Sequence, residues 1–498
     1  MTIRDEYPLA FKALSAVETD QSGGPLQHIL SLESGWSSRL NGESKESVLD
    51  PDSSRKAADC DAEYDVVVAG GGLSLLYAIQ LARSGFKVAV LDRKRVASSH
   101  REWNASFSEL DALVGAGLFS EAQVLDFIDL RYDRGIVRWH NGREHSVEGV
   151  LDCAVSSRDL LAALRSLAQA QGVEILDFHR YIRYFESSRG LCVEVSPEDG
   201  ERAFLFCRLL LDARGVESDH GQFDILCPTV GGVISGLDTG SGPRKLDSKV
   251  GEILVSTEGI EDGRQHIWEG FPLSGDLLTT YLFYYASPQS LGEHPLLSLY
   301  ERFFANLSRY KSGKAILERP TYGIIPGNSR LRSCSLSPGD RIYLVGDAAS
   351  RHSPLTFCGF GAIIRSFESI STSLARLLDS DRLDRASLDA VRCEREGLRV
   401  MGGLALMMVA DRQGLPCGSN LINSLLDDAF AALKASGQIN YRNFMQDEIG
   451  FYEFLRYMLE VARHRPTVWQ EVFRQLSPEE AVLYFRQILA FGIRDLVR

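Results

Sequence analysis

Residues 64–92 constrain this chain more than any other stretch, because YDVVVAGGGLSLLYAIQLARSGFKVAVLD reads as strand, glycine turn, helix and second strand. The apolar run 64–69 is typical of a buried strand. Gly70, Gly71 and Gly72 follow and let the chain turn where a side chain would block an approaching pyrophosphate. The next helix directs its free N–H groups and positive dipole end at such an anion. The stretch therefore predicts a βαβ unit that binds a dinucleotide.

The end of this unit supplies the remaining parts of a nucleotide site. Gly85 stands where a C-terminal helix cap belongs, and the return strand 87–91 is followed by Asp92 and Arg93, two candidate cofactor contacts. An acid about twenty positions after the glycines is the acceptor that a ribose hydroxyl pair needs. Leu75 occupies the place of the usual third glycine, so helix and strand cannot approach quite as closely as the pattern assumes. The alternative is a tight turn before an ordinary packed helix. Such a turn does not require a helix cap at Gly85 and an acid at Asp92 to follow in this order.

A second motif spans residues 342–370, IYLVGDAASRHSPLTFCGFGAIIRSFESI. Its first four residues predict a buried strand, whose carboxyl end is where open α/β sheets bind ligands. The acid that follows is placed to accept hydrogen bonds from a ribityl chain, and the later glycines precede a helix whose N-terminus suits the polar edge of a flavin. The candidate contacts are Gly346, Asp347, Pro354, Gly359 and Gly361. Two nucleotide motifs some 280 residues apart indicate FAD, because NAD-binding folds do not need a second cofactor-binding motif.

Two shorter stretches add candidates near the cofactor. REWNAS follows the return strand, and there Arg101 either meets a phosphate or lies on the surface, while Trp103 either covers a ring or packs in the core. LLLDARG ends a buried strand at Asp212 and Gly215, in a turn that either touches the cofactor or is an ordinary turn.

The candidate proton donor is Glu269, which stands between Trp268 and Gly270 in QHIWEGFPLSGDLLTTYLFYYASP. Apolar surroundings raise the pKa of a carboxyl and favour its acid form, the condition for a proton donor. The aromatic and β-branched run 279–285 predicts a strand that walls an apolar cavity. The alternative for Glu269 is a solvated or paired surface carboxylate.

The order of these motifs predicts an α/β fold: a Rossmann-type FAD-binding domain with an inserted β-rich substrate domain and a C-terminal helical region. We expect a flexible leader at 1–62 that contains a short helix over 8–17, and a discontinuous FAD-binding domain at 63–215 and 320–395. We expect a substrate-binding β-rich domain at 216–319 and helices at 396–498.

Composition narrows the partners and the compartment. A formal net charge of -13, with 54 Lys plus Arg against 67 Asp plus Glu, argues against nucleic-acid binding, which rests on phosphate neutralisation. Nine cysteines without a C-x-x-C pair favour thiols in a reducing compartment. No apolar run reaches the 18 or so residues of a membrane span, and the start of the chain lacks an apolar signal core. We therefore expect a cytoplasmic protein.

The C-terminal region carries arginines between Phe, Tyr, Leu and Met in amphipathic stretches. The arginines are Arg456, Arg463, Arg465, Arg474 and Arg486. A helical cap on the substrate domain accounts for this pattern, and a face that lies on a membrane surface is the alternative.

The pairing of VVVAGGGLS and LDRK with GDAASRHSPLTFCGFGA, and the DARG turn between them, resembles the FAD-containing monooxygenase and reductase superfamily that includes aromatic hydroxylases and geranylgeranyl reductases. Within it, REWNAS, IWEGFP with TTYLFYY, SPLTFCGFGA, and NSLLDDAF with FMQDEIGF are similar to the CruA/CruP-type lycopene cyclases. This likeness runs from about residue 64 to 455.

The resemblance implies an enzyme that uses reduced FAD, without net redox change, to close the linear end groups of lycopene into β-ionone rings. It implies Glu269 as the acid and residues 281–285 as the lining of a channel for the apolar polyene. We expect no metal ion. The motifs leave the oligomeric state and the number of ends cyclised open.

The same FAD motifs fit two other functions. One is an FAD-dependent monooxygenase or dehydrogenase that acts on an apolar substrate, and the other is a catalytically silent paralogue that binds carotenoid. If Glu269 lies away from the cavity, Asp212, Glu102 or His352 is the next candidate donor. For His352, however, a structural role is favoured over a catalytic one.

Overall fold

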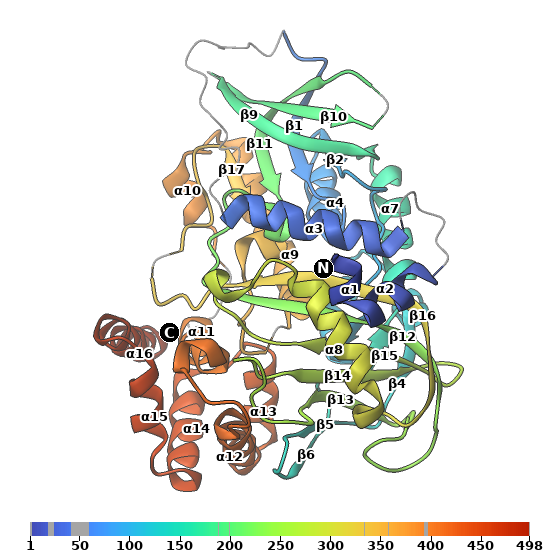
Figure 1. Cartoon of the computed structure of the whole chain (residues 1–498). Coiled ribbons are helices and arrows are strands. Elements are labelled where there is room, and N and C mark those ends of the chain that lie inside the picture. The colour runs from blue at the N-terminus through green and yellow to red at the C-terminus, as the bar shows by residue number, and fades with distance from the viewer. Residues whose placement is uncertain are drawn as a thin grey trace.

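The chain folds into two large sheets with helices packed around them, as seen in a computed structural model (Figure 1). The structure describes residues 2–17, 24–40, 59–187, 189–198, 200–332, 334–356, 358–392 and 397–497. A Rossmann-type parallel sheet, a β-rich sheet and a helical C-terminal region confirm the predicted α/β fold class.

The first sheet contains the predicted βαβ unit. Its order is β8-β2-β1-β11-β10-β9, with β17 also paired to β11. The parallel strands are β1 (Ala62–Ala69), β2 (Val88–Leu91), β8 (Glu174–Leu176), β11 (Ala203–Asp212) and β17 (Ile342–Leu344), and the antiparallel ones are β9 (His179–Ser187) and β10 (Gly190–Pro197). Because the parallel strands share one direction, their carboxyl ends lie along a single edge of the sheet.

Helices cover one face of this sheet. These are α4 (Leu75–Arg83), α7 (Ser157–Ala170) and α9 (Gly359–Asp379). Strand alternation turns Val66 and Val68 of β1 into the core that these helices share, while Val67 and Ala69 pack against β9 and β10 on the other face. The carboxyl edge of the sheet is left facing the second sheet.

The second sheet is mixed and has the order β16-β12-β15-β14-β13-β5-β6. Its strands are β5 (Arg134–Arg138), β6 (Glu144–Val147), β12 (Ile225–Leu237), β13 (Val250–Val255), β14 (Ile267–Leu273), β15 (Leu277–Phe283) and β16 (Gly313–Gly327). Helix α8 (Pro295–Tyr310) packs on one face of it. A small third sheet joins β3 (Trp103–Ala105), β7 (Cys153–Val155) and β4 (Ile128–Arg131).

The strand pairing moves the domain boundaries that we expected. The expected FAD-binding domain includes residues 63–215, and β5 and β6 fall within that range. They nevertheless lie in the second sheet, because β5 pairs in parallel with β13 and β6 pairs with β5. Strand β16 crosses the expected boundary at residue 320 without a break. The sequences of β5 and β6 do not indicate which sheet these strands join, because the parallel partner of β5 is β13, a segment more than 100 residues further along the chain.

Residues 8–15 and 24–36 of the N-terminal segment pack against the rest of the fold, which corrects the expectation of a flexible leader there. Helices α1 (Ile3–Glu6), α2 (Pro8–Ser15) and α3 (Gly24–Leu40) precede the first sheet, and α2 falls where a short helix was expected. Buried Glu33 of α3 accepts hydrogen bonds from the backbone N–H groups of Leu296 and Leu297, at 2.8 and 3.0 Å, at the N-terminus of α8. Residues 18–23 and 41–58, which belong to the expected leader, lie outside the described residues.

The C-terminal region is helical, as predicted. Its longer helices are α11 (Gly397–Ala405), α12 (Leu421–Ser436), α13 (Gln438–Met445), α14 (Phe451–His464), α15 (Val468–Gln475) and α16 (Pro478–Val497). The short helices α5 (Asp111–Gly115), α6 (Glu121–Asp126) and α10 (Arg385–Asp389) lie earlier in the chain. Among the residues that the structure describes, no helix is both long and apolar enough to cross a membrane.

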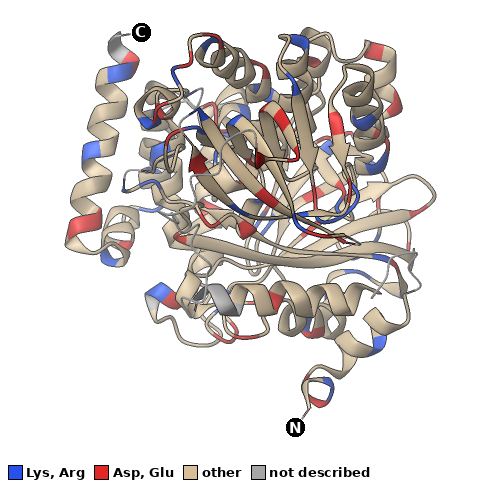
Figure 2. Ribbon diagram, turned by 90° about the horizontal axis from the view of Figure 1, so that it is seen from above, with Lys and Arg blue, Asp and Glu red and all other residues tan. Residues whose placement is uncertain are grey.

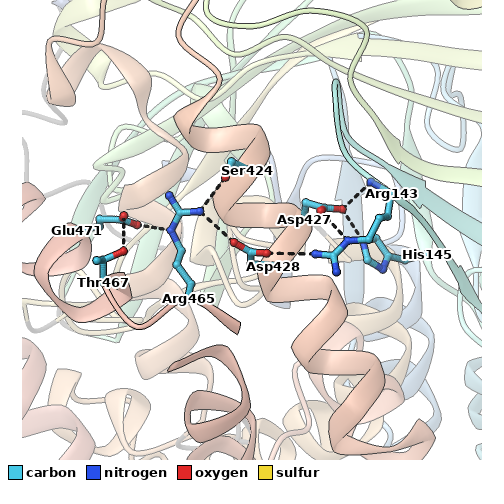
Figure 3. Close-up of polar contacts among 8 residues, drawn as sticks. All are labelled: Arg143, His145, Ser424, Asp427, Asp428, Arg465, Thr467 and Glu471. Atoms are coloured by element: carbon cyan, nitrogen blue, oxygen red, sulfur yellow. Dashed lines mark hydrogen bonds and ion pairs between the residues drawn. The ribbon is translucent and has the colours of Figure 1, made fainter. Parts of the chain in front are cut away.

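A polar network attaches these helices to the second sheet (Figure 3). Asp427 of α12 accepts a hydrogen bond from Arg143 Nε at 2.8 Å, and its other oxygen lies 2.7 Å from Nε2 of His145 in β6. The next residue, Asp428, joins Arg143 to Arg465, at 3.1 and 3.0 Å. The two acids are adjacent on α12. Together they connect one turn of this helix to the β5–β6 hairpin, through Arg143 and His145, and to the end of α14, through Arg465.

Candidate functional site

A cavity of about 1080 Å³ lies between the carboxyl edge of the first sheet and the inner face of the second. The glycine turn after β1 lines one side of it, and β12, β14 and β15 line the other. Most of the predicted site residues line this cavity. They are Gly70, Gly71, Gly72, Asp92, Arg93, Arg101, Gly215, Glu269, Gly346, Asp347, Gly359 and Gly361.

The glycine turn has the geometry of a nucleotide-binding loop. Gly70 has a φ of 113°, and a Cβ there would lie 2.6 Å from the carbonyl oxygen of Ala213. The N–H group of Gly71 donates to Asp92 at 2.8 Å, so the acid at the end of β2 fixes the turn as well as facing the cavity. A Cβ on Gly72 would meet nothing within 4 Å. The space beside Gly72 is therefore open, and it leads to the N-terminus of α4, the end of a helix that suits a phosphate.

The second motif closes the cavity from the neighbouring strand. Strand β17 delivers Gly346, with a φ of 59°, and Asp347 to the carboxyl edge, beside Gly215 in the turn after β11. Gly359 and Gly361 begin α9, whose N-terminus faces the same space. A Cβ on Gly361 would collide with the carboxylate of Glu109, so the helix start is held close to that side chain.

Two predicted cofactor contacts do not line the cavity. Asp212 is buried and accepts hydrogen bonds from Arg214 Nη2 at 2.8 Å and from Ser218 Oγ at 2.7 Å. Burial alone would raise the pKa of Asp212, but Arg214 and Ser218 hold it below its ordinary value. This carboxylate orders the turn that carries Gly215. Pro354 lies instead against Gly327 of β16.

The stretch after β2 contributes side chains from the remaining side. Arg93 pairs with Glu217 at 2.7 Å, and the guanidinium of Arg101 lies against Gly323 of β16. Trp103 stacks on Phe360 with 5.0 Å between ring centroids and an interplanar angle of 27°. All three predicted side chains of this stretch line the cavity. The tryptophan covers the start of α9.

Glu269 points into the cavity because β14 alternates its side chains. Trp268 turns to the opposite face and stacks on Tyr310 at 4.7 Å, whereas Glu269 and Phe271 line the cavity. Asn104 Nδ2 donates to Glu269 Oε1 at 3.1 Å, and the hydroxyl of Tyr132 donates to Asn104 Oδ1. Burial raises the pKa of Glu269 to about 7, against the opposing effect of Asn104. The carboxyl is thus partly protonated at neutral pH.

The wall beside Glu269 is aromatic and apolar. Tyr281 and Phe283 of β15 and Tyr285 just after it line the cavity, whereas Leu282 and Tyr284 between them point into the core beneath α8. In register, Tyr281 stands opposite Glu269 on the neighbouring strand β14. The hydroxyl of Tyr281 donates to the carbonyl oxygen of Glu102 at 2.8 Å, so its polar atom is satisfied and its ring is presented to the cavity. The expected lining at 281–285 thus consists of alternate residues.

The other candidate donors are less suited to proton transfer. Glu102 also lines the cavity and burial raises its pKa, but it pairs with Arg319 and accepts from the N–H of Ser157 at 3.2 Å. His352 lines the cavity as well, and burial lowers its pKa, so the neutral imidazole is favoured. Asp212 does not reach the cavity. Of these acids, Glu269 is held by one neutral hydrogen-bond donor and not by an ion pair.

Sequence reasoning missed three contributors to the site. Asn104 lies inside the REWNAS motif, yet nothing in that motif points to a carboxylate more than 160 residues away. Tyr132 acts through Asn104 and carries no local signal. Helix α3 lines the outer part of the cavity with Leu32 and Trp36, and its weakly amphipathic sequence gave no indication of this position.

Comparisons with solved structures show the same fold in several proteins at low sequence identity. A geranylgeranyl bacteriochlorophyll reductase-like protein from Thermoplasma acidophilum matches with a TM-score of 0.58 and 16% identity, over 83% of this chain and 100% of that one. Halogenase PltM in complex with phloroglucinol and FAD matches with a TM-score of 0.54 and 13% identity, over 87% and 93%. A flavoprotein/dehydrogenase from Cytophaga hutchinsonii matches with a TM-score of 0.52 and 14% identity, over 85% and 99%.

No protein-family model matches the chain, and no curated protein matches it. The structural matches cover nearly the whole length of each of these three proteins, so the likeness includes both large sheets and is not confined to the βαβ unit. The chain therefore has the fold of these flavoprotein-type structures.

Proposed function

We propose that this chain is an FAD-dependent enzyme that acts on an elongated apolar substrate, and more specifically a lycopene cyclase. The observation that carries the proposal is the position of Glu269. Its carboxyl, with a pKa raised to about 7 by burial, lies in an apolar wall of the same cavity whose opposite side is the glycine turn. A proton donor facing a nucleotide-binding loop across an apolar space is what this reaction requires.

The residues present fit FAD. The turn Gly70–Gly72 and the N-terminus of α4 would hold the diphosphate, since Gly72 leaves open space there. Asp92 would accept from the ribose hydroxyls and Asp347 from the ribityl chain, and the N-terminus of α9 would face the isoalloxazine ring. Bound in its reduced, anionic form, FAD would supply a negative charge that stabilises a cation in a dry cavity.

The chemistry assigned to Glu269 is a proton transfer without net redox change. Its acid form gives a proton to a terminal double bond of the polyene, whose π electrons form the new C–H bond and leave a tertiary carbocation. The neighbouring double bond attacks this carbon and closes the ring. A ring carbon then loses a proton, and a proton returns to the carboxylate of Glu269. The product is an isomer of the substrate, so atoms and electrons balance.

The aromatic wall supports a cationic reaction at this place. The faces of Tyr281, Phe283 and Tyr285 offer negative quadrupoles to a carbocation and exclude the water that would quench it. Asn104 holds Glu269 Oε1 and leaves the other carboxyl oxygen for the substrate. General acid catalysis by such a group contributes typically 10²- to 10⁴-fold.

A second candidate is an FAD-dependent oxidoreductase for an apolar substrate, since the fold is shared with a reductase-like protein and a halogenase. The deciding experiment incubates the purified, FAD-loaded protein with lycopene under reducing conditions and follows both pigment and NAD(P)H. Ring formation with an unchanged electron count supports the cyclase. Product formed with stoichiometric NAD(P)H oxidation contradicts the cyclase, and retained pigment without product in any redox state leaves only a carotenoid-binding role.

A further inference from the structure

Exposed apolar side chains are concentrated on two helices at the C-terminal end. More than half of the exposed large hydrophobic residues in the described part of the chain lie on α14 and α16. Tyr452, Leu455 and Leu459 lie on α14, and the four on α16 form what we term the C-terminal apolar face, which consists of Val482, Phe485, Leu489 and Ile493. Figure 2 shows α16, the helix that ends at C, at the edge of the molecule.

The spacing of these residues marks a continuous stripe on α16. Val482, Phe485, Leu489 and Ile493 follow one another at intervals of three or four residues and are 52% to 65% exposed. Tyr484, on the opposite side of the same helix, is buried. An α-helix returns to the same side every 3.6 residues, so the four side chains share its outward face. Helix α16 therefore carries apolar side chains on the side that packs against the protein and also on its exposed side.

Aromatic residues extend the stripe onto the neighbouring helix. Phe485 of α16 stacks on Phe473 of α15 with ring centroids 5.0 Å apart, and Phe473 stacks in turn on Trp469 at 6.1 Å. Aromatic side chains of this size favour the boundary between an apolar phase and water. The surface is larger than one helix and richer in rings than an ordinary solvated face.

The acids on α14 and α16 have partners within the protein. Glu453 accepts from Asn443 Nδ2 at 2.9 Å, and Asp495 accepts from the N–H of Phe451 at 3.0 Å. Glu460 pairs with Arg463, and the acids at the start of α16, Glu479 and Glu480, pair with Arg332 and Arg412 at 3.2 and 2.8 Å. The exposed Arg456 and Arg486 stand beside the apolar stripes of α14 and α16. An apolar stripe bordered by arginines, on a chain whose net charge is -13, complements an anionic surface and not a second copy of this acidic chain.

We propose that the C-terminal apolar face binds the surface of an anionic lipid bilayer, with α16 lying in the interface plane. Its apolar side chains enter the boundary between headgroups and acyl chains, while the arginines contact lipid phosphates. No helix among the described residues is suited to span, so the contact is one of lying on the membrane. This proposal rests on the surface alone and does not depend on the cofactor or the reaction.

The test is flotation of the full-length protein with vesicles of phosphatidylcholine alone and of phosphatidylcholine with phosphatidylglycerol. The intact chain is expected to float with the anionic vesicles and to be released as salt is raised. Leu489→Glu places a charge in the stripe and is expected to reduce the bound fraction at least about tenfold. Leu125→Glu is the matched control, because Leu125 is similarly exposed, at 53%, on the distant helix α6.

Thermal melting confirms that each variant is folded before flotation is compared. Folded wild-type protein that floats with neither vesicle overturns the proposal, as does equal loss of binding in the Leu125→Glu control. Equal binding to both vesicle types overturns the anionic part. Sedimentation of the wild-type chain as a dimer that Leu489→Glu converts to a monomer assigns the face to a second copy and also overturns it.

Discussion

Removing the amide of Asn104 is expected to raise the pKa of Glu269. The amide donates to Glu269 Oε1 at 3.1 Å and stabilises the carboxylate over the acid. A hydrogen bond to a charged group contributes about 1.5–3 kcal/mol, and one pKa unit corresponds to about 1.36 kcal/mol, so Asn104→Ala should raise the pKa by about 1–2 units. Starting from about 7, the fraction in the acid form at pH 8 rises from roughly a tenth to at least about half.

The assay is a pH titration of the Glu269 carboxyl by difference infrared spectroscopy, which reads the acid form directly and needs no turnover. The alkaline limb of the pH–rate profile should move upward by the same amount. Tyr132→Phe is the graded control, because the hydroxyl of Tyr132 only orients Asn104 and its loss should shift the pKa less than loss of the amide does. An unchanged carboxyl titration in folded Asn104→Ala protein would refute the assignment of this amide as the partner that sets the pKa of Glu269.

Two further predictions concern the glycine turn and the buried Asp447, which accepts hydrogen bonds from the N–H of Ser353 at 2.8 Å and from the hydroxyl of Thr356 at 3.0 Å. Gly70→Ala should lower the melting temperature even without cofactor, because the new Cβ would lie 2.6 Å from the Ala213 carbonyl oxygen. Gly72→Ala should melt like wild type, because its Cβ meets nothing, and yet bind FAD at least about tenfold more weakly in a flavin-fluorescence titration. Burial raises the pKa of Asp447 to about 6, so its contribution to stability is complete below its unfolded pKa of about 3.8 and is lost as pH rises through 6. Asp447→Asn should therefore remove up to roughly 3 kcal/mol of that decline between pH 4 and 7, and identical melting curves for both proteins across this range would count against it.

The parts of the site that the sequence predicted are those built within a short stretch of chain. The turn at Gly70 and the acid Asp92 lie at the two ends of one βαβ unit, so strand, turn and return strand bring them together without help from the rest of the fold. The same holds for Gly346 and Asp347 at the end of β17. Glu269 lines the cavity, but its apolar surroundings come from Phe271 and the facing strand, whereas its neighbour Trp268 points to the other face of the sheet.

The parts that were missed depend on contacts between distant segments. Glu33 caps the start of α8 across more than 260 residues, and this long-range contact holds an N-terminal helix that we had expected to be flexible. Asp212 was expected at the cofactor, but Arg214, two residues along the chain, takes both of its oxygens into an ion pair. The pairing of β5 with β13 likewise follows from tertiary packing and leaves no periodicity in the sequence of either strand.

The measurement that tests the central claim most directly is product formation by Glu269→Gln at matched FAD content. Glutamine keeps the size of the side chain and its ability to bond to Asn104, and it removes the exchangeable acid that faces the cavity. Purified wild type and variant should carry the same bound flavin by absorbance, and the variant should form cyclised product at least about 100-fold more slowly. A decrease smaller than roughly threefold, with flavin retained, would contradict proton transfer by Glu269 and with it the proposed reaction.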